Sequence, residues 1–198
     1  MSRPSTAADT SNRILDVAER LVKTRGFNAF SYADIAEALK VTKASLHYHF
    51  PTKADLGARL VERYSASFLS ALVRIEQDTL DAIGRLNAYV GIYADVLEDN
   101  RICLCGMLAA EYATLPGAMR KGIRGFFDAN EAWLAQVLAT GRRRSQIGFI
   151  GSPSDAARAL MATLEGAMLL ARSRQEPAQF RSIARRSLSA FKIRRAAA

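Results

Sequence analysis

The chain has 198 residues, 49% of them hydrophobic, and its 28 basic and 19 acidic residues give a formal net charge of +9. This length allows one large or two small domains with a substantial core, and a basic balance is typical of proteins that bind a polyanion. The polar opening MSRPSTAADTSN lacks the apolar stretch of a signal peptide, and no apolar run approaches transmembrane length. We therefore expect a cytoplasmic protein with no membrane partner.

The first predicted element is a helix over residues 12–26, after about ten residues that we expect to be disordered. Within it, Ile14, Ala18, Leu21 and Val22 recur at helical spacing and form one apolar stripe. This stripe predicts an amphipathic helix with one buried face.

Two short helices are predicted over residues 31–53, SYADIAEALKVTKASLHYHFPTK. Ser31 is a good N-cap, and Asp34 stands three residues later in the capping-box relation. Thr42 is a second N-cap, which would start a helix at Lys43. That helix is short because a following proline, Pro51, disfavours helical backbone at the residue before it.

The second of these helices carries the strongest functional signal. Leu46 and Phe50, four residues apart, form its inward face and leave small, polar and basic side chains outside. A short helix of this kind, joined tightly to another, can lie in the major groove of DNA. The alternative is that both are ordinary surface helices of an all-α domain.

Helical patterns continue to the end of the chain, and no strand pattern or repeat competes with them. Apolar stripes predict helices from Lys53 to about Ile75, through Leu86–Leu97, and from Ile123 to near Gly141. Asn100 is a candidate cap for a helix that reaches Tyr112. The segment 148–153 is predicted as a loop, followed by helices over 154–174 and 177–193. The sequence therefore predicts an all-α fold.

The segment from Ser11 to Leu60 resembles the DNA-binding domain of the TetR family of transcriptional repressors. The resemblance covers NRILDVAERLVKTRG and GFNAFSYADIAEALKVTKASLHYHFPTKADL. It implies an N-terminal three-helix helix-turn-helix domain and a larger helical effector-binding and dimerisation domain. The corresponding boundaries are 1–10 for a disordered arm, 11–52 for the DNA-binding domain and 53–198 for the rest.

The resemblance also implies which residues contact an operator. Base-edge or groove contacts are expected from Lys43, Ala44 and Ser45. Phosphate contacts are expected from Ser31, Tyr32, Tyr48, His49 and Lys53. His47 stands where the family commonly has tyrosine, and it can still donate to phosphate. A homodimer bound to a palindromic double-stranded operator is expected, because a two-fold dimer reads two half-sites.

A small-molecule effector is implied for the larger domain, whose helices 154–174 and 177–193 are expected to form the dimer. Each candidate effector residue is an aromatic, sulfur-containing or basic side chain that could equally serve as ordinary structure. The candidates are Tyr89, Tyr93, Cys103, Met107, Tyr112, Phe127, Trp133, Met168 and Arg172.

The chain has two cysteines, Cys103 and Cys105, which point roughly 200° apart on a helix, so no disulfide between them is expected. If Asn100 caps the helix, its dipole and Arg101 would favour a reactive thiolate at Cys103. The run CLCGMLAAE is similar to a segment of the TetR repressors that respond to N-ethylmaleimide and other electrophiles. Arg172 stands where that subgroup has a lysine. The alternative is that both cysteines are small core residues.

An enzyme is not expected, because the only histidines, His47 and His49, face opposite ways on one helix and make a poor metal pair. The sequence has no Gly-rich phosphate loop and no nucleophile elbow, and we expect no cofactor. Three functions remain: a repressor released by a small molecule, the same DNA reader sensing electrophiles or oxidants through Cys103, and an all-α interaction protein without DNA binding.

Overall fold

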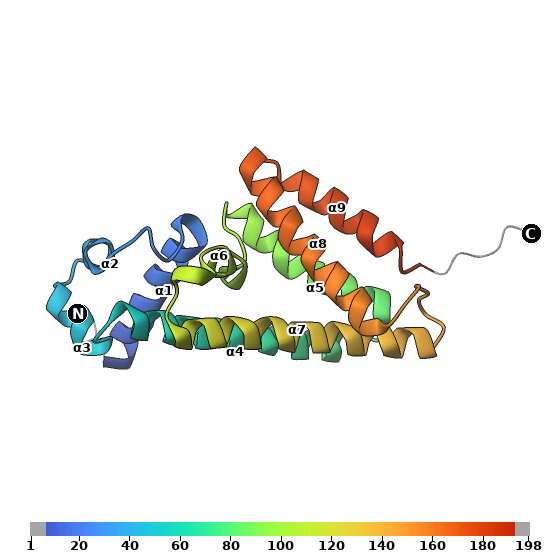
Figure 1. Ribbon diagram of the computed structural model, residues 1–198, viewed down its shortest axis with the longest axis horizontal. Coiled ribbons are helices and arrows are strands. Elements are labelled where there is room, and N and C mark those ends of the chain that lie inside the picture. The colour runs from blue at the N-terminus through green and yellow to red at the C-terminus, as the bar shows by residue number, and fades with distance from the viewer. Residues whose placement is uncertain (1–6, 193–198) are drawn as a thin grey trace, which may run out of the picture. The chain divides into compact units, whose positions relative to one another are not determined.

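The computed structural model describes residues 7–192, which form nine α-helices, one 3-10 helix and no strand (Figure 1). The predicted all-α fold is confirmed. In chain order the elements are α1 (Ala7–Arg25), α2 (Tyr32–Leu39), α3 (Lys43–His49), α4 (Lys53–Asp78), α5 (Ala82–Glu98), α6 (Leu104–Ala110), η1 (Tyr112–Thr114), α7 (Gly117–Arg143), α8 (Pro153–Arg174) and α9 (Pro177–Ser189).

The chain divides into two compact units. The first unit comprises Met1–Ser65 and Leu104–Arg124, and the second comprises Ala66–Cys103 and Gly125–Ala198. Helices α4 and α7 therefore contribute residues to both units. This division differs from the expected linear one, because α6, η1 and the start of α7 join the N-terminal helices in one unit.

The predicted caps of α2 and α3 are present. The Ser31 side chain accepts from the N–H of Ala33, and the Asp34 carboxylate accepts from the N–H of Ser31 at 2.7 Å, which completes the capping box. Thr42 Oγ1 accepts from the N–H of Ser45 at 3.2 Å. Phe50 is extended, with φ −137° and ψ 96°, as expected for the residue before a proline.

Two predicted boundaries are wrong. The first helix begins at Ala7, so residues 7–10 are helical rather than disordered, while residues 1–6 lie outside the described part. Asn100 does not cap a helix: it has a φ of 55°, follows α5, and donates its N–H to Leu97 O. Asparagine adopts this left-handed conformation readily, which suits the end of a helix as well as a start. Helix α6 begins only at Leu104. The expected end of the last helix, Ile193, lies outside the described residues.

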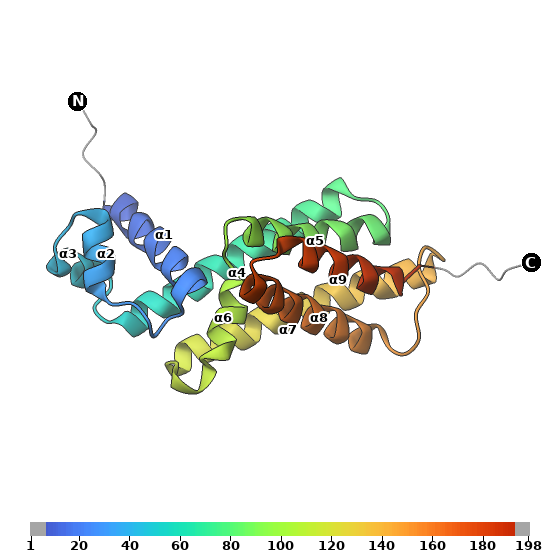
Figure 2. The same ribbon diagram turned by 90° about the horizontal axis from the view of Figure 1, so that it is seen from above.

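Each unit has its own core. In the first unit, Ile14, Ile35, Leu46 and Leu60 are fully buried between helices α1, α2, α3 and α4. In the second unit, α8 and α9 lie side by side in both views (Figures 1 and 2), and Phe180 of α9 is fully buried. None of the helices within residues 7–192 is long and apolar enough to cross a membrane.

Candidate functional site

Helix α3 of the first unit presents a polar face to solvent. Lys43, Ala44 and His47 are exposed, Tyr48 is 80% exposed, and only Leu46 of this helix is buried. The small Ala44 allows another backbone to approach closely, and Lys43 adds positive charge at the start of the helix. This face has the composition of a helix that reads a DNA groove.

The two histidines are held in different ways. His47 Nδ1 lies 3.0 Å from Pro51 O, and its ring lies 4.8 Å from the ring of Tyr32. The His49 ring packs edge-on against Tyr48 at 5.2 Å. His47 therefore keeps its second ring nitrogen for an outside partner.

Tyr32, a predicted phosphate contact, bonds within the unit in this structure. Its side chain is buried, and its hydroxyl donates to Phe50 O at 2.8 Å. Burial, with the nearby Asp55 carboxylate, raises the pKa of Tyr32 to about 12. The hydroxyl thus joins the start of α2 to the end of α3 and fixes the angle between the two helices.

Lys53 is also used inside the unit. Its ammonium donates to Phe27 O at 2.6 Å and to Phe30 O, and it lies 4.6 and 4.3 Å from the centroids of the Phe27 and Phe30 rings. Burial lowers the pKa of Lys53, and the carboxylates of Glu111 and Asp34 partly offset this effect. Two of the three N–H groups are committed, so only the third is available to a phosphate.

Glu111 completes the same region and was not among the predicted residues. Its carboxylate accepts from the backbone N–H of Phe27 at 2.6 Å and of Asn28 at 3.2 Å. The Asn28 side chain donates to Thr114 Oγ1 at 2.8 Å. Glu111 directly follows α6, eight residues after Cys103. Its two hydrogen bonds therefore tie the end of α6 to the loop between α1 and α2.

The second unit contains a cluster of buried and half-buried polar and aromatic side chains, which we call the α5–α7–α8 cluster. It consists of Tyr89 and Tyr93 from α5, Asn130 and Trp133 from α7, Glu165 from α8, and Cys103. The Tyr89 and Tyr93 hydroxyls are 3.1 Å apart, and Tyr89 donates to Asn130 Oδ1 at 3.3 Å. The Tyr89 ring stacks on Trp133 at 5.6 Å, and burial raises the pKa of both tyrosines above the ordinary range.

Glu165 is the charged member of this cluster. Burial raises the pKa of its carboxyl group to about 7, although hydrogen bonds from Cys103 and Tyr93 oppose that rise. Its Oε1 atom is buried and has no hydrogen-bond partner in the described part of the chain, and the same holds for Trp133 Nε1. Glu165 was not predicted, but it is an isolated acid in the apolar run ALMATLEGAMLL, which is a usable signal.

The surroundings of Cys103 differ from those expected. The residue precedes α6 instead of lying in its first turn, and Arg101 forms an ion pair with Asp99. Cys103 is 2% exposed and hydrogen-bonds to Glu165, which stabilises the thiol and not the thiolate. Cys103 and Cys105 are both buried thiols with no disulfide between them.

The structure brings together only some of the predicted effector residues. Tyr89, Tyr93, Cys103 and Trp133 meet in the cluster. Phe127, Met168 and Arg172 also belong to the second unit, whereas Met107 and Tyr112 belong to the first. Asn130, fully buried and donating to Phe126 O at 2.7 Å, is a further member that sequence reasoning missed.

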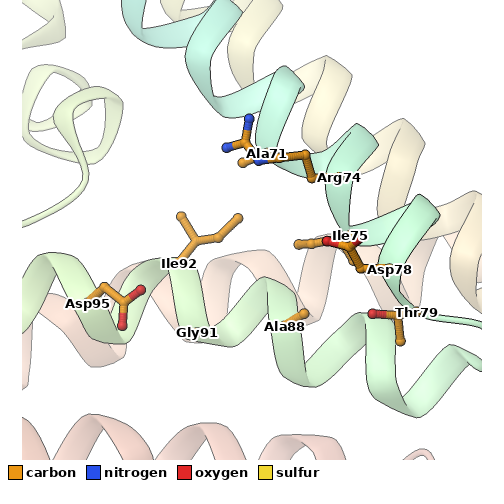
Figure 3. A pocket seen from close by; sticks show the side chains of 9 residues that line it. All are labelled: Ala71, Arg74, Ile75, Asp78, Thr79, Ala88, Gly91, Ile92 and Asp95. Carbon is orange, nitrogen blue, oxygen red and sulfur yellow. The ribbon is translucent and has the colours of Figure 1, made fainter.

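The second unit also has open grooves. One, of about 300 Å³, lies between α4 and α5, where Arg74, Asp78 and Asp95 flank small and apolar side chains (Figure 3). Another, of about 930 Å³, is lined by Phe149, Leu160 and Phe191, among others. Both are surface features, in contrast to the buried cluster.

The all-α fold, with α2 and α3 forming a helix-turn-helix, places the chain in the class of helix-turn-helix proteins. The family model for the bacterial regulatory proteins of the tetR family matches residues 14–60, and the model for the tetracyclin repressor-like C-terminal domain matches residues 82–187. The protein belongs to the TetR family of transcriptional regulators, which are not enzymes.

Individual relatives agree with this assignment. The chain is 25% identical over 190 residues to the transcriptional regulator AcuR of Cereibacter sphaeroides, covering 92% of this chain and 87% of AcuR. A TetR-family regulator from Agrobacterium tumefaciens has a structure similar to this one, with a TM-score of 0.92, 32% identity, and coverage of 95% and 100% of the two chains. The reduced form of E. coli NemR gives a TM-score of 0.80 at 25% identity, with 92% and 97% covered.

Proposed function

We propose that this TetR-family regulator is a dimeric repressor that acts in the cytoplasm and is released from its operator by a small molecule bound in the second unit. The observation that carries the proposal is the exposed face of α3. The end of this helix is held in place by the buried hydrogen bond from the Tyr32 hydroxyl to Phe50 O. Base-edge contacts come from Lys43, Ala44 and Ser45. Phosphate contacts come from Tyr48, from His47 when both of its ring nitrogens carry a hydrogen, from Ser31 and His49, and from the third N–H of Lys53.

Dimerisation is supported by the outer face of α8. Ala159 and Ala162 are exposed, Gly166 has open space where a side chain would lie, and Leu169 and Leu170 are 49% and 50% exposed. These residues recur at helical spacing, so they form one apolar stripe that a second copy of the helix can cover. A two-fold dimer then presents two α3 helices to a palindromic site.

Effector release follows from linkage between the two sites. A molecule that binds one arrangement of the dimer more tightly than the other shifts the population toward it. The α5–α7–α8 cluster supports the second unit as the binding site, because it holds buried polar atoms whose hydrogen-bonding capacity is unused.

The test is a titration of labelled DNA from upstream of the protein's own gene, followed by fluorescence anisotropy at several salt concentrations. We expect saturable binding that weakens steeply with salt, and a loss of about tenfold or more in affinity for Tyr48→Ala and Lys43→Ala. Lys121→Ala, at an exposed lysine on α7, is the matched control. Binding that ignores both salt and these substitutions would favour the interaction-protein alternative.

Sensing through Cys103 is the second candidate, because this thiol lies within the same cluster as Tyr93 and Glu165. Operator binding is measured before and after treatment with N-ethylmaleimide. Loss of binding in the parent but not in Cys103→Ser supports it, and equal responses exclude it.

A further inference from the structure

Among the described residues, no basic side chain forms an ion pair with the Glu165 carboxyl group. The groups that bond to it, Cys103 and Tyr93, are neutral donors. Arg158, on the same helix, pairs with Glu131 and Asp155 instead. A buried carboxylate without a positive partner is costly, and perturbed titratable groups of this kind cluster at functional sites.

Aromatic rings belong to the same cluster, and one of them, Tyr93, bonds to Glu165. The ring centroids of Tyr89 and Tyr93 are 5.3 Å apart, and the ring centroid of Phe68 lies 6.0 Å from that of Tyr89 and 6.1 Å from that of Tyr93. Trp133 stacks on Tyr89, which places an indole ring in the same group. Faces of aromatic rings attract organic cations, and the attraction is greatest where water is excluded.

Two unpaired atoms show what a ligand must carry. Glu165 Oε1 can accept a hydrogen bond, and Trp133 Nε1 can donate one. Parts of the Glu165 and Trp133 side chains are exposed, whereas Tyr89, Tyr93 and Asn130 are buried. The two unpaired atoms are themselves buried, so a ligand must enter between these side chains to reach them.

We propose that the α5–α7–α8 cluster binds a small protonated amine that carries an oxygen acceptor. The ammonium group donates to Glu165 Oε1 and lies against the aromatic rings, and the oxygen accepts from Trp133 Nε1. This rests on the proposed function in one respect, namely that the effector binds in the second unit. It specifies the chemistry of that effector.

The charge state of the carboxyl group distinguishes this ligand from a neutral one. An ammonium ion stabilises the ionised carboxylate, whereas a neutral alcohol of the same shape leaves the charge uncompensated. A carboxylic acid would place a second negative charge beside the first. The site should therefore prefer the amine over its neutral isostere, and the neutral isostere over the anion.

The experiment uses the full chain and isothermal titration calorimetry with 4-aminobutan-1-ol, 1,4-butanediol and 4-hydroxybutyrate. Trp133 is the chain's single tryptophan, so its fluorescence reports binding at this position in the same samples. We expect the amine to bind at least about tenfold more tightly than the diol, as for a charge-assisted hydrogen bond. The hydroxybutyrate should bind most weakly.

Variants test the assignment of each group. Glu165→Gln should weaken the amine about tenfold or more and leave the diol unchanged, whereas Glu176→Gln, at an exposed glutamate of the same unit, should alter neither. Trp133→Phe keeps a ring but removes the N–H, and should weaken both the amino alcohol and the diol.

Equal affinity of amine and diol, undiminished amine binding by Glu165→Gln, or no binding of any amine at millimolar concentration overturns the proposal. These results would leave operator binding intact, so they differ from a failure of the proposed function. Release of the operator by N-ethylmaleimide through Cys103, without any amine binding, would assign the cluster to thiol sensing instead.

Discussion

The two units treat partly buried charges in opposite ways. In the first unit, Lys23 Nζ pairs with Glu19 at 2.6 Å, Lys53 donates to two carbonyls, and Glu111 accepts from two backbone N–H groups. Burial alone would raise the pKa of Glu19, but Lys23 and Arg63 outweigh it and lower that pKa. In the second unit, Glu165 keeps an unpaired oxygen and a raised pKa.

This difference fits a first unit whose structure is fixed by its charges and a second unit that changes when a ligand binds. Compensated charges join α1 to α4 and hold the loop between α1 and α2, which gives the DNA reader a fixed frame. An uncompensated charge reduces stability, and such sites commonly serve binding. The comparison predicts where substitutions will stabilise the protein and where they will not.

The largest expected effect is at Glu165. Its carboxyl group has an ordinary pKa of 4.5, raised to about 7 in the folded state, so the folded protein holds this proton over a pH range where the unfolded chain has lost it. The free energy of unfolding therefore falls as pH rises from about 4.5 to 7, by about 1.4 kcal/mol per unit and on the order of 3 kcal/mol in all.

Urea denaturation of the parent and of Glu165→Gln at pH 5 and pH 8 measures this effect. The difference between the two proteins cancels the titration of other groups, and the variant should gain stability relative to the parent at pH 8. Parallel pH profiles would show that Glu165 is compensated after all, and the contrast between the units would disappear.

Glu111→Ala should have the next largest effect, with the opposite sign. It leaves the N–H groups of Phe27 and Asn28 without their carboxylate and removes a negative charge near Lys53, so we expect a loss of about 2 kcal/mol. Chemical denaturation measures the loss, with Glu176→Ala as the exposed control. A loss as small as that of the control would mean that this carboxylate is dispensable.

Tyr32→Phe and Tyr48→Phe form a matched pair within the DNA-reading unit. Removing the buried Tyr32 hydroxyl should lower the free energy of unfolding by about 1 kcal/mol with little change in operator affinity for the folded protein. Removing the exposed Tyr48 hydroxyl should lower the operator affinity and leave the free energy of unfolding almost unchanged. If Tyr32→Phe weakens DNA binding without loss of stability, its hydroxyl contacts the operator.

Arg59→Gln should have the smallest effect. The Arg59–Glu62 pair has a 2.7 Å contact, but the two side chains are 59% and 66% exposed. Exposed pairs contribute little, so a change below about 0.5 kcal/mol is expected in urea denaturation. A larger loss would show that surface charges also contribute to holding the first unit together.

The helix-turn-helix could be predicted from the sequence because its signals are local. The Ser31–Asp34 capping box and the Thr42 cap act over three residues, and Pro51 acts on its neighbour. Asn100 misled the prediction because the same residue type suits a helix start and a left-handed helix end. The helix boundary therefore could not be decided from that residue alone.

The site was harder to predict because its contacts are distant in sequence or involve the backbone. The carbonyls that hold Tyr32 and Lys53 are present at every residue, so no side-chain pattern identifies them. Glu165 reaches Cys103 and Tyr93 only through the packing of separate helices. Tyr89, Tyr93 and Trp133 were found because aromatic residues on inward stripes are visible in the sequence.

The bond from Glu111 to the Phe27 amide also has a consequence for synthesis on the ribosome. The two residues are 84 positions apart, and the first unit takes residues from both sides of that gap. When α3 leaves the exit tunnel, the loop after α1 still lacks the carboxylate that will hold it. The nascent DNA reader should therefore stay incompletely protected against amide hydrogen exchange until Glu111 emerges. A chain stalled before that point should bind operator DNA with lower affinity than the complete first unit.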